Sequence, residues 1–187
     1  MSCTRRRLLH LGTMAGATLG IPWARAALAG AAATPPTSDV KRIALLNVHT
    51  GERVDAEFFR QGRYVVDSLV AIEFLLRDFR TGELRAIDPG LLDYLVAAAA
   101  RCAAEPVFKV ISGYRSSRTN EQLRVPGSGV ARHSLHIEGR AVDVRLAGVE
   151  CATLASRARD LGRGGVGYYR SSDFVHLDTG SPRSWTG

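Results

Sequence analysis

Two short segments in the C-terminal half of the chain, residues 141–146 and 174–177, alternate apolar and polar side chains. Such alternation is typical of a strand with one face in a core, so the fold must contain a sheet. In the first segment the valines share the inward face and Asp143 lies on the opposite face, and in the second segment His176 does the same. If the two strands are neighbours, Asp143 and His176 converge on one side of the sheet.

The rest of the chain predicts a mixture of strands and helices. Further strands are expected at residues 41–48, 53–59 and 107–111. Helices are expected at residues 65–79, after Pro89, at 151–161 and, as a short element, after Arg115. The glycine-rich segment 162–167 is interpreted as tight turns before the last strand. We therefore expect an α+β domain with a small, mainly antiparallel sheet flanked by helices.

The N-terminus has the order of a bacterial export signal. Three arginines at positions 5–7 precede a weakly apolar stretch at residues 11–21, and Ala24-Arg25-Ala26 offers a small-x-small cleavage site. Paired arginines before a modestly apolar stretch resemble a twin-arginine signal. We predict a signal at residues 1–26 that directs the protein to the periplasm, with an uncleaved membrane anchor as the alternative.

The predicted signal is followed by a linker and one domain. Residues 27–39 are small, polar and proline-bearing, which is typical of a linker. Residues 40–187 suffice for a single domain with one core. No run in them approaches the ~18 apolar residues that a spanning helix requires, so we expect no stable membrane span after processing.

The charge gives little reason to expect a nucleic-acid partner. The whole chain has a net charge of +7, and Arg5, Arg6, Arg7 and Arg25 supply four of these charges in residues 1–26, which contain no acid. A net charge of +3 is therefore left for the remainder. A domain of this charge, without a run of basic and aromatic residues, is atypical of proteins that bind nucleic acid.

Cys102 and Cys151 are the cysteines outside the predicted signal. In an oxidising compartment they have the number needed for one disulfide. Both lie in segments rich in alanine and leucine, so a pair of buried free thiols is an equal alternative.

A histidine in the loop before residues 141–146 adds a third member to the polar pair. Two imidazoles, from His136 and His176, and the carboxylate of Asp143 match the ligand set of a catalytic zinc ion, which keeps a fourth position for water. The spacing alone is weak evidence, because single histidines and aspartates are more often surface or hydrogen-bonded residues. Both interpretations stay open on these residues alone.

Longer motifs resemble a known family. Ser134-x-His136-x-x-Gly139-x-Ala141-x-Asp143, together with Phe174-Val175-His176-x-Asp178, is similar to the zinc metallopeptidases that include D-Ala-D-Ala carboxypeptidases, VanX-type dipeptidases and L-alanyl-D-glutamate endolysins. Their exported murein-endopeptidase branch, of the MepK/YcbK type, is the most similar. It also resembles this chain at residues 112–116, 119–120, 164–169 and 176–180, and at Arg183 and Trp185. The resemblance covers about Val40 to the C-terminus and implies a Hedgehog/D,D-peptidase-like fold.

The resemblance implies roles for individual residues. His136, Asp143 and His176 match the family's zinc ligands. Arg115 matches an arginine near the scissile carbonyl, where a guanidinium can stabilise the oxyanion that develops during hydrolysis. The alternative role for Arg115 is a structural salt bridge.

The general base is open between two carboxylates. Some branches of the family carry an acid three residues before the last histidine, which makes Asp173 the candidate base. Asp178 is the rival, and its expected role is to orient a metal ligand. His133 matches no ligand position and is expected to be an exposed loop residue.

We therefore predict a periplasmic zinc peptidase whose partners are peptidoglycan stem peptides or cross-links, and which hydrolyses the cross-links. D,D and L,D cleavage are both open. Tyr114, Tyr168 and Tyr169 are expected to line the substrate groove or to pack in the core. Two other functions stay open, namely a D-Ala-D-Ala carboxypeptidase or dipeptidase, and a non-catalytic zinc-containing cell-wall-binding module.

Overall fold

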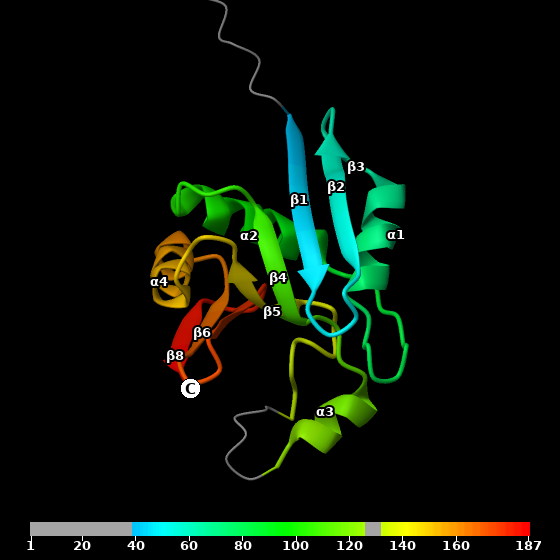
Figure 1. Cartoon of the computed structure of the whole chain (residues 1–187), viewed down its shortest axis with the longest axis vertical. Coiled ribbons are helices and arrows are strands. Elements are labelled where there is room, and N and C mark those ends of the chain that lie inside the picture. Colours follow the sequence, from blue (N-terminus) through cyan, green and yellow to red (C-terminus); the bar gives the residue numbers. More distant parts are fainter. Residues whose placement is uncertain (1–38, 126–131) are drawn as a thin grey trace, which may run out of the picture. The chain divides into compact units, whose positions relative to one another are not determined.

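The structure is a computed structural model that describes residues 39–125 and 132–187 (Figure 1). The predicted export signal, residues 1–26, and residues 27–38 of the predicted linker lie outside the described residues. The strands are β1 (Val40–Asn47), β2 (Arg53–Arg60), β3 (Arg63–Tyr64), β4 (Val107–Ser112), β5 (Ala141–Leu146), β6 (Gly165–Tyr169), β7 (Phe174–Asp178) and β8 (Arg183–Thr186). The helices are α1 (Val66–Leu75), α2 (Pro89–Arg101), α3 (Ser117–Leu123) and α4 (Cys151–Leu161).

These strands form one eight-stranded sheet in the order β3-β2-β1-β4-β5-β7-β6-β8. The α+β prediction is confirmed, but the small, mainly antiparallel sheet is wrong, because β4 runs parallel to β1 and β8 runs parallel to β6. The first parallel pair arises because α1 and α2 lie between the β1–β2 hairpin and β4, and such a crossover returns the chain in its original direction. The second arises because β8 follows β7 and pairs with the other side of β6.

Strand β6 occupies part of the segment that the sequence analysis interpreted as turns. Its glycines allow close packing: a Cβ atom on Gly167 would lie only 2.5 Å from Cε2 of Trp185 in β8. A glycine inside a strand often marks such a close approach of another group. The neighbour comes from a distant part of the chain, so local sequence does not distinguish this strand from a turn.

Helix α1 ends at Leu75, before the predicted end at residue 79. The backbone N–H of Tyr114 donates to the carbonyl oxygen of Leu76 at 2.7 Å, which directs the chain away from the helix. A turn follows, closed by a bond of 3.0 Å from the N–H of Asp78 to the carbonyl oxygen of Glu83. Residues 78–83 therefore form a loop beside the segment that carries Arg115.

Helices α2 and α4 pack on each other and against the sheet. Helix α2 starts at the predicted Pro89, and the side chain of Asp88 accepts a bond of 2.9 Å from the N–H of Gly90. Its buried Tyr94 hydroxyl donates to the carbonyl oxygen of Ala158 in α4 at 3.0 Å. Every helix in the described ranges is too short or too polar to span a membrane.

Strands β5 and β7 are antiparallel neighbours inside the sheet, and their register pairs Asp143 directly with His176. This arrangement confirms the prediction from the alternating pattern. It brings the two polar side chains to one point on the same face of the sheet.

Both cysteines outside the predicted signal are free thiols. Burial raises the pKa of the half-buried Cys102, and burial together with a hydrogen bond to Asp173 raises the pKa of Cys151 to about 11. The structure thus has free thiols, as in the second of the two predicted alternatives, but only Cys151 is buried. Both thiols stay protonated at neutral pH.

Candidate functional site

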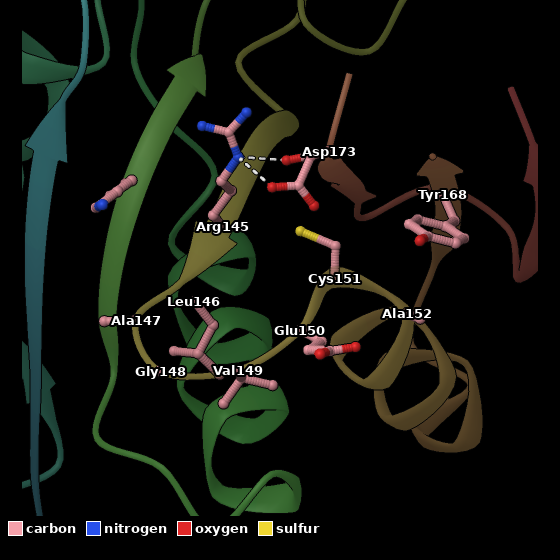
Figure 2. A pocket seen from close by; sticks show the side chains of 11 residues that line it. Arg145, Leu146, Ala147, Gly148, Val149, Glu150, Cys151, Ala152, Tyr168 and Asp173 are labelled. Carbon is pink, nitrogen blue, oxygen red and sulfur yellow. Dashed lines mark hydrogen bonds and ion pairs between the residues drawn. The ribbon is translucent and has the colours of Figure 1, made fainter. Parts of the chain in front are cut away.

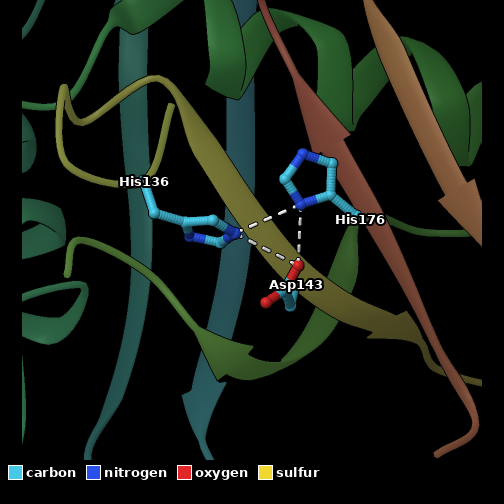
Figure 3. Close-up of side chains that lie close together, drawn as sticks. All are labelled: His136, Asp143 and His176. Atoms are coloured by element: carbon cyan, nitrogen blue, oxygen red, sulfur yellow. Dashed lines mark hydrogen bonds and ion pairs between the residues drawn. The ribbon is translucent and has the colours of Figure 1, made fainter. Parts of the chain in front are cut away.

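Three polar side chains converge where β5 and β7 pair (Figure 3). The Nε2 atom of His136 lies 3.1 Å from Nδ1 of His176 and 3.3 Å from Oδ1 of Asp143. The Nδ1 atom of His176 lies 2.9 Å from the same carboxylate oxygen. All three side chains are buried. The structure therefore brings together the three residues that the sequence predicted as metal ligands.

The main chain orients the ring of His136, which lies in a tight turn before β5. Its Nδ1 atom lies 2.7 Å from the carbonyl oxygen of Gly113. A carbonyl oxygen only accepts hydrogen bonds, so Nδ1 carries the proton and Nε2 presents a lone pair to the cluster. The carbonyl oxygen of His136 in turn accepts from the N–H of Arg115 at 3.2 Å, which ties the two segments together.

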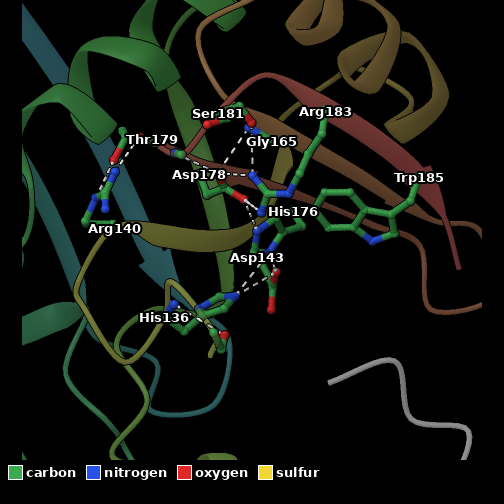
Figure 4. A network of polar contacts seen from close by, with 12 residues as sticks. His136, Arg140, Asp143, Gly165, His176, Asp178, Thr179, Ser181, Arg183 and Trp185 are labelled. Carbon is green, nitrogen blue, oxygen red and sulfur yellow. Dashed lines mark hydrogen bonds and ion pairs between the residues drawn. The ribbon is translucent and has the colours of Figure 1, made fainter. Parts of the chain in front are cut away.

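A buried carboxylate orients the ring of His176 in the same manner. Its Nε2 atom lies 2.9 Å from Oδ2 of Asp178, which is fully buried. Asp178 also accepts bonds from the N–H groups of Gly165 and Gly180 and forms an ion pair of 2.7 Å with Arg183 (Figure 4). This network holds Asp178 ionised as the acceptor, so Nδ1 of His176 presents its lone pair to the cluster.

These bonds make the cluster suitable for a cation. Nε2 of His136, Nδ1 of His176 and Oδ1 of Asp143 are all acceptors, and acceptors this close together require a shared proton or a metal ion between them. Ligand atoms about 2.0–2.1 Å from a tetrahedral zinc ion lie roughly 3.3 Å from one another, close to the separations in this cluster. The donor set and its spacing therefore fit a zinc ion.

The pKa values of the cluster follow from burial and from the mutual contacts. Burial lowers the pKa of His136 to about 4, so this ring is neutral at physiological pH. Burial alone would raise the pKa of Asp143, but its close contacts with the two imidazole rings lower it well below its usual range. Burial also opposes the charged form of His176, but its bonds to Asp143 and Asp178 outweigh burial and raise its pKa. A metal ion that binds here displaces the proton that His176 attracts.

Arg115 lies beside the cluster, immediately before the Ser116 cap of α3. One terminal nitrogen of its guanidinium donates to Oδ2 of Asp143 at 3.2 Å, and the residue is only 8% exposed. Its Nε–H has no hydrogen-bond partner among the described residues. A buried donor without a partner is costly, so this atom is suited to meet an oxygen of a bound ligand.

The cluster opens into a groove of about 370 Å³. The groove is lined by aromatic and cationic side chains together with the three cluster residues. Besides the cluster, its lining includes His49, Arg80, Arg115, His133, Tyr169, Phe174, Arg183 and Trp185. A pocket of mixed apolar and convergent polar groups is the typical form of a substrate site.

Asp173, the predicted general base, lies elsewhere. It contributes to a different pocket of about 510 Å³, together with Arg145 and Cys151 (Figure 2). Its carboxylate forms an ion pair of 3.3 Å with Arg145, and its side chain is 69% exposed. Its backbone has a positive φ of 50°. It is absent from the described lining of the groove. This position does not favour Asp173 as the general base. Catalytic contacts often tighten only when substrate binds, so the role stays a prediction.

The other predicted groove residues are divided between three locations. Tyr169 lines the groove, Tyr168 lines the pocket of Asp173, and Tyr114 is buried in the core. His133 is exposed and lies at the groove, without joining the cluster of His136, Asp143 and His176.

Among the polar residues of the groove, two were not named in the sequence analysis. His49 reaches the groove from the turn between β1 and β2, and Arg80 reaches it from the loop after α1. No local pattern marks either residue, because only the tertiary fold brings these turns to the site.

Comparison with known proteins identifies the family of the chain. Residues 35–185 match the family model described as peptidoglycan L,D-endopeptidase MepK. The peptidoglycan L,D-endopeptidase MepK of Escherichia coli K12 is 38% identical over 181 residues, which cover 97% of this chain and 96% of the relative. The probable peptidoglycan L,D-endopeptidase MepK of Haemophilus influenzae is 36% identical over 184 residues, covering 98% of this chain and 96% of the relative. No solved structure matches the chain. The family match covers most of the sequence, and the chain therefore belongs to the peptidoglycan L,D-endopeptidase MepK family.

Proposed function

We propose that this protein is a periplasmic, zinc-dependent endopeptidase that cuts L,D peptide bonds in peptidoglycan cross-links, with His136, Asp143 and His176 as the zinc ligands. The observation that carries the proposal is the convergence of three lone-pair donors at the base of a groove. The names of the relatives supply the substrate class and the type of bond.

The residues around the cluster have separable tasks in such a reaction. Zinc held there would activate a water molecule by lowering its pKa toward ~7 and would polarise the substrate carbonyl. The carbonyl of Gly113 and the carboxylate of Asp178 keep the two imidazole rings in the required tautomer. The guanidinium of Arg115 donates to the substrate oxygen as negative charge develops on it.

Periplasmic location is part of the proposal and is supported by the order of residues 1–26. The basic start, the modestly apolar stretch and the small residues around Arg25 are the features of an exported chain. Fractionation of cells that express the full chain tests this part, and recovery of the protein from the cytoplasm alone would reject it.

Digestion of purified cross-linked muropeptides tests the activity. We expect the protein to convert dimers to monomers, a chelator to stop the reaction and added zinc to restore it. Product masses separate cross-link cleavage from the loss of a terminal D-Ala. Dimers that persist in the presence of zinc would contradict the proposal.

Replacing Asp178 with asparagine tests the orientation of His176. The amide keeps the shape of the side chain but removes the negative charge that holds the Nε2 proton, so we expect zinc affinity to fall by about 10- to 100-fold. Titration with a competing chelator measures this affinity. Asp55→Asn is the matched control, because Asp55 is an exposed partner of Arg42 on the β1–β2 hairpin. Equal zinc affinity in both variants would remove Asp178 from the role.

Replacing Asp173 with alanine tests the general base. Since its carboxylate pairs with Arg145 in the other pocket, we expect turnover to stay within about threefold of the unsubstituted protein. The test is to measure steady-state hydrolysis and zinc content in parallel for the variant and the unsubstituted protein. A large loss of kcat with full zinc content would instead assign the base to Asp173.

A further inference from the structure

The groove above the candidate ligands has an excess of positive charge. Arg80, Arg115 and Arg183 all line it, and Asp143 is the one acid among its described lining residues. Since the carboxylate of Asp143 belongs to the ligand cluster, it leaves the charge of the outer groove uncompensated.

The three arginines differ in their partners. Arg183 forms two contacts with Asp178, at 3.1 Å and 2.7 Å, and Arg115 pairs with Asp143 at 3.2 Å. Arg80 is exposed, and within the described ranges its guanidinium forms no ion pair or hydrogen bond. The N–H groups of this planar guanidinium are therefore available to bind an anion in the groove.

Arg80 is nevertheless held in place by its neighbours. Its backbone N–H donates to Oδ1 of Asp78 at 3.0 Å, and Oδ2 of the same buried carboxylate accepts from the N–H and hydroxyl of Ser116. Its guanidinium carbon lies 4.2 Å from the centre of the Phe79 ring, which stacks on His49. Asp78 thus links the loop of Arg80 to the segment of Arg115, so little ordering is needed when a ligand binds.

The guanidiniums of Arg80 and Arg115 lie in the same groove, where their like charges repel each other. A carboxylate bound beside both cations would offset this repulsion, so the groove favours an anionic ligand over a neutral one.

We infer that Arg80 binds a free carboxylate of the substrate close to the scissile bond. The enzyme would therefore prefer cross-linked peptides with a free carboxylate beside that bond over peptides that carry an amide there. The inference rests on the proposed function. Peptidoglycan stem peptides carry such free carboxylates, and a guanidinium recognises them through two parallel hydrogen bonds.

Two substrates and one substitution test this inference. The substrates are a synthetic cross-linked peptide with a free carboxylate on a residue that flanks the scissile bond, and the same peptide with a primary amide in its place. We expect the unsubstituted protein to have a higher kcat/KM on the acid than on the amide. Arg80→Gln should lower kcat/KM on the acid by roughly 10- to 100-fold and leave the amide almost unchanged.

Control variants separate recognition from a general effect. Arg80→Lys should retain part of the preference, because it keeps the charge without the planar fork. Arg42→Gln, on an exposed arginine of β1 outside the groove, should behave like the unsubstituted protein. Equal losses on both substrates in Arg80→Gln, or no loss on either, would overturn the inference.

The same measurements separate this inference from the proposed function. If the unsubstituted protein cleaves acid and amide equally well, the carboxylate inference is wrong and the endopeptidase proposal stands. If zinc-loaded protein cleaves neither peptide nor purified muropeptide dimers, the proposed function fails, and the inference fails with it.

Discussion

Replacing His176 with alanine is expected to abolish zinc binding and to lower turnover by at least ~10³-fold, because the activated water is lost with the metal. The side chain supplies one of three converging lone pairs, and the two that remain do not complete the ligand set of a catalytic zinc site. Metal analysis of the purified variant and single-turnover hydrolysis of cross-linked dimers measure the two effects.

The fold is expected to survive this substitution. His176 is at the floor of the groove, whereas the neighbouring Val175 and Leu177 belong to the hydrophobic core. The thermal unfolding of the variant should therefore be compared with that of the unsubstituted protein after zinc has been removed from both. His133→Ala is the matched control, since this histidine lies at the groove without joining the cluster. Full zinc content in His176→Ala would refute the ligand assignment.

Replacing Arg115 with glutamine is expected to reduce kcat by about 10²- to 10³-fold while zinc content is retained. The guanidinium is buried beside Asp143, and its Nε–H has no partner among the described residues, so we expect it to meet charge that develops on the substrate. Loss of a contact made only in the transition state lowers kcat more than it raises KM.

The alternative role of Arg115, a structural salt bridge with Asp143, gives a different result. A purely structural loss would lower the melting temperature and the zinc content together, because the carboxylate would lose a buried partner. Arg115→Lys separates the two further, since it keeps the charge but removes the Nε–H donor. Unchanged kcat in Arg115→Gln would exclude the transition-state role.

The convergence of Asp143 and His176 was predictable because side chains in a strand alternate between its two faces. The apolar residues of β5 and β7 face the core. Because successive side chains point to opposite faces, Asp143 and His176 lie on the other face. His136 was harder to predict, since a loop residue has no such period. Its place in the loop before β5 made it a candidate for the third ligand, and the family resemblance implied the same role.

The remaining errors have a tertiary origin. Hydrogen bonds from Tyr114 and Asn47 to the last turn of α1 end that helix early, and the partners come from distant strands and loops. The parallel position of β8 depends on which side of β6 is open, which no local propensity encodes. Arg80 was missed for the same reason, because the loop after α1 carries no pattern that points to the groove.

The bond between His136 and the carbonyl of Gly113 has a consequence for enzyme engineering. Because the main chain sets the protonated nitrogen of this ring, libraries that vary groove residues without contacts to the cluster leave the orientation of His136 unchanged. Gly113 must not be varied in such libraries. Any side chain there would collide with the backbone of Leu76 and move the carbonyl.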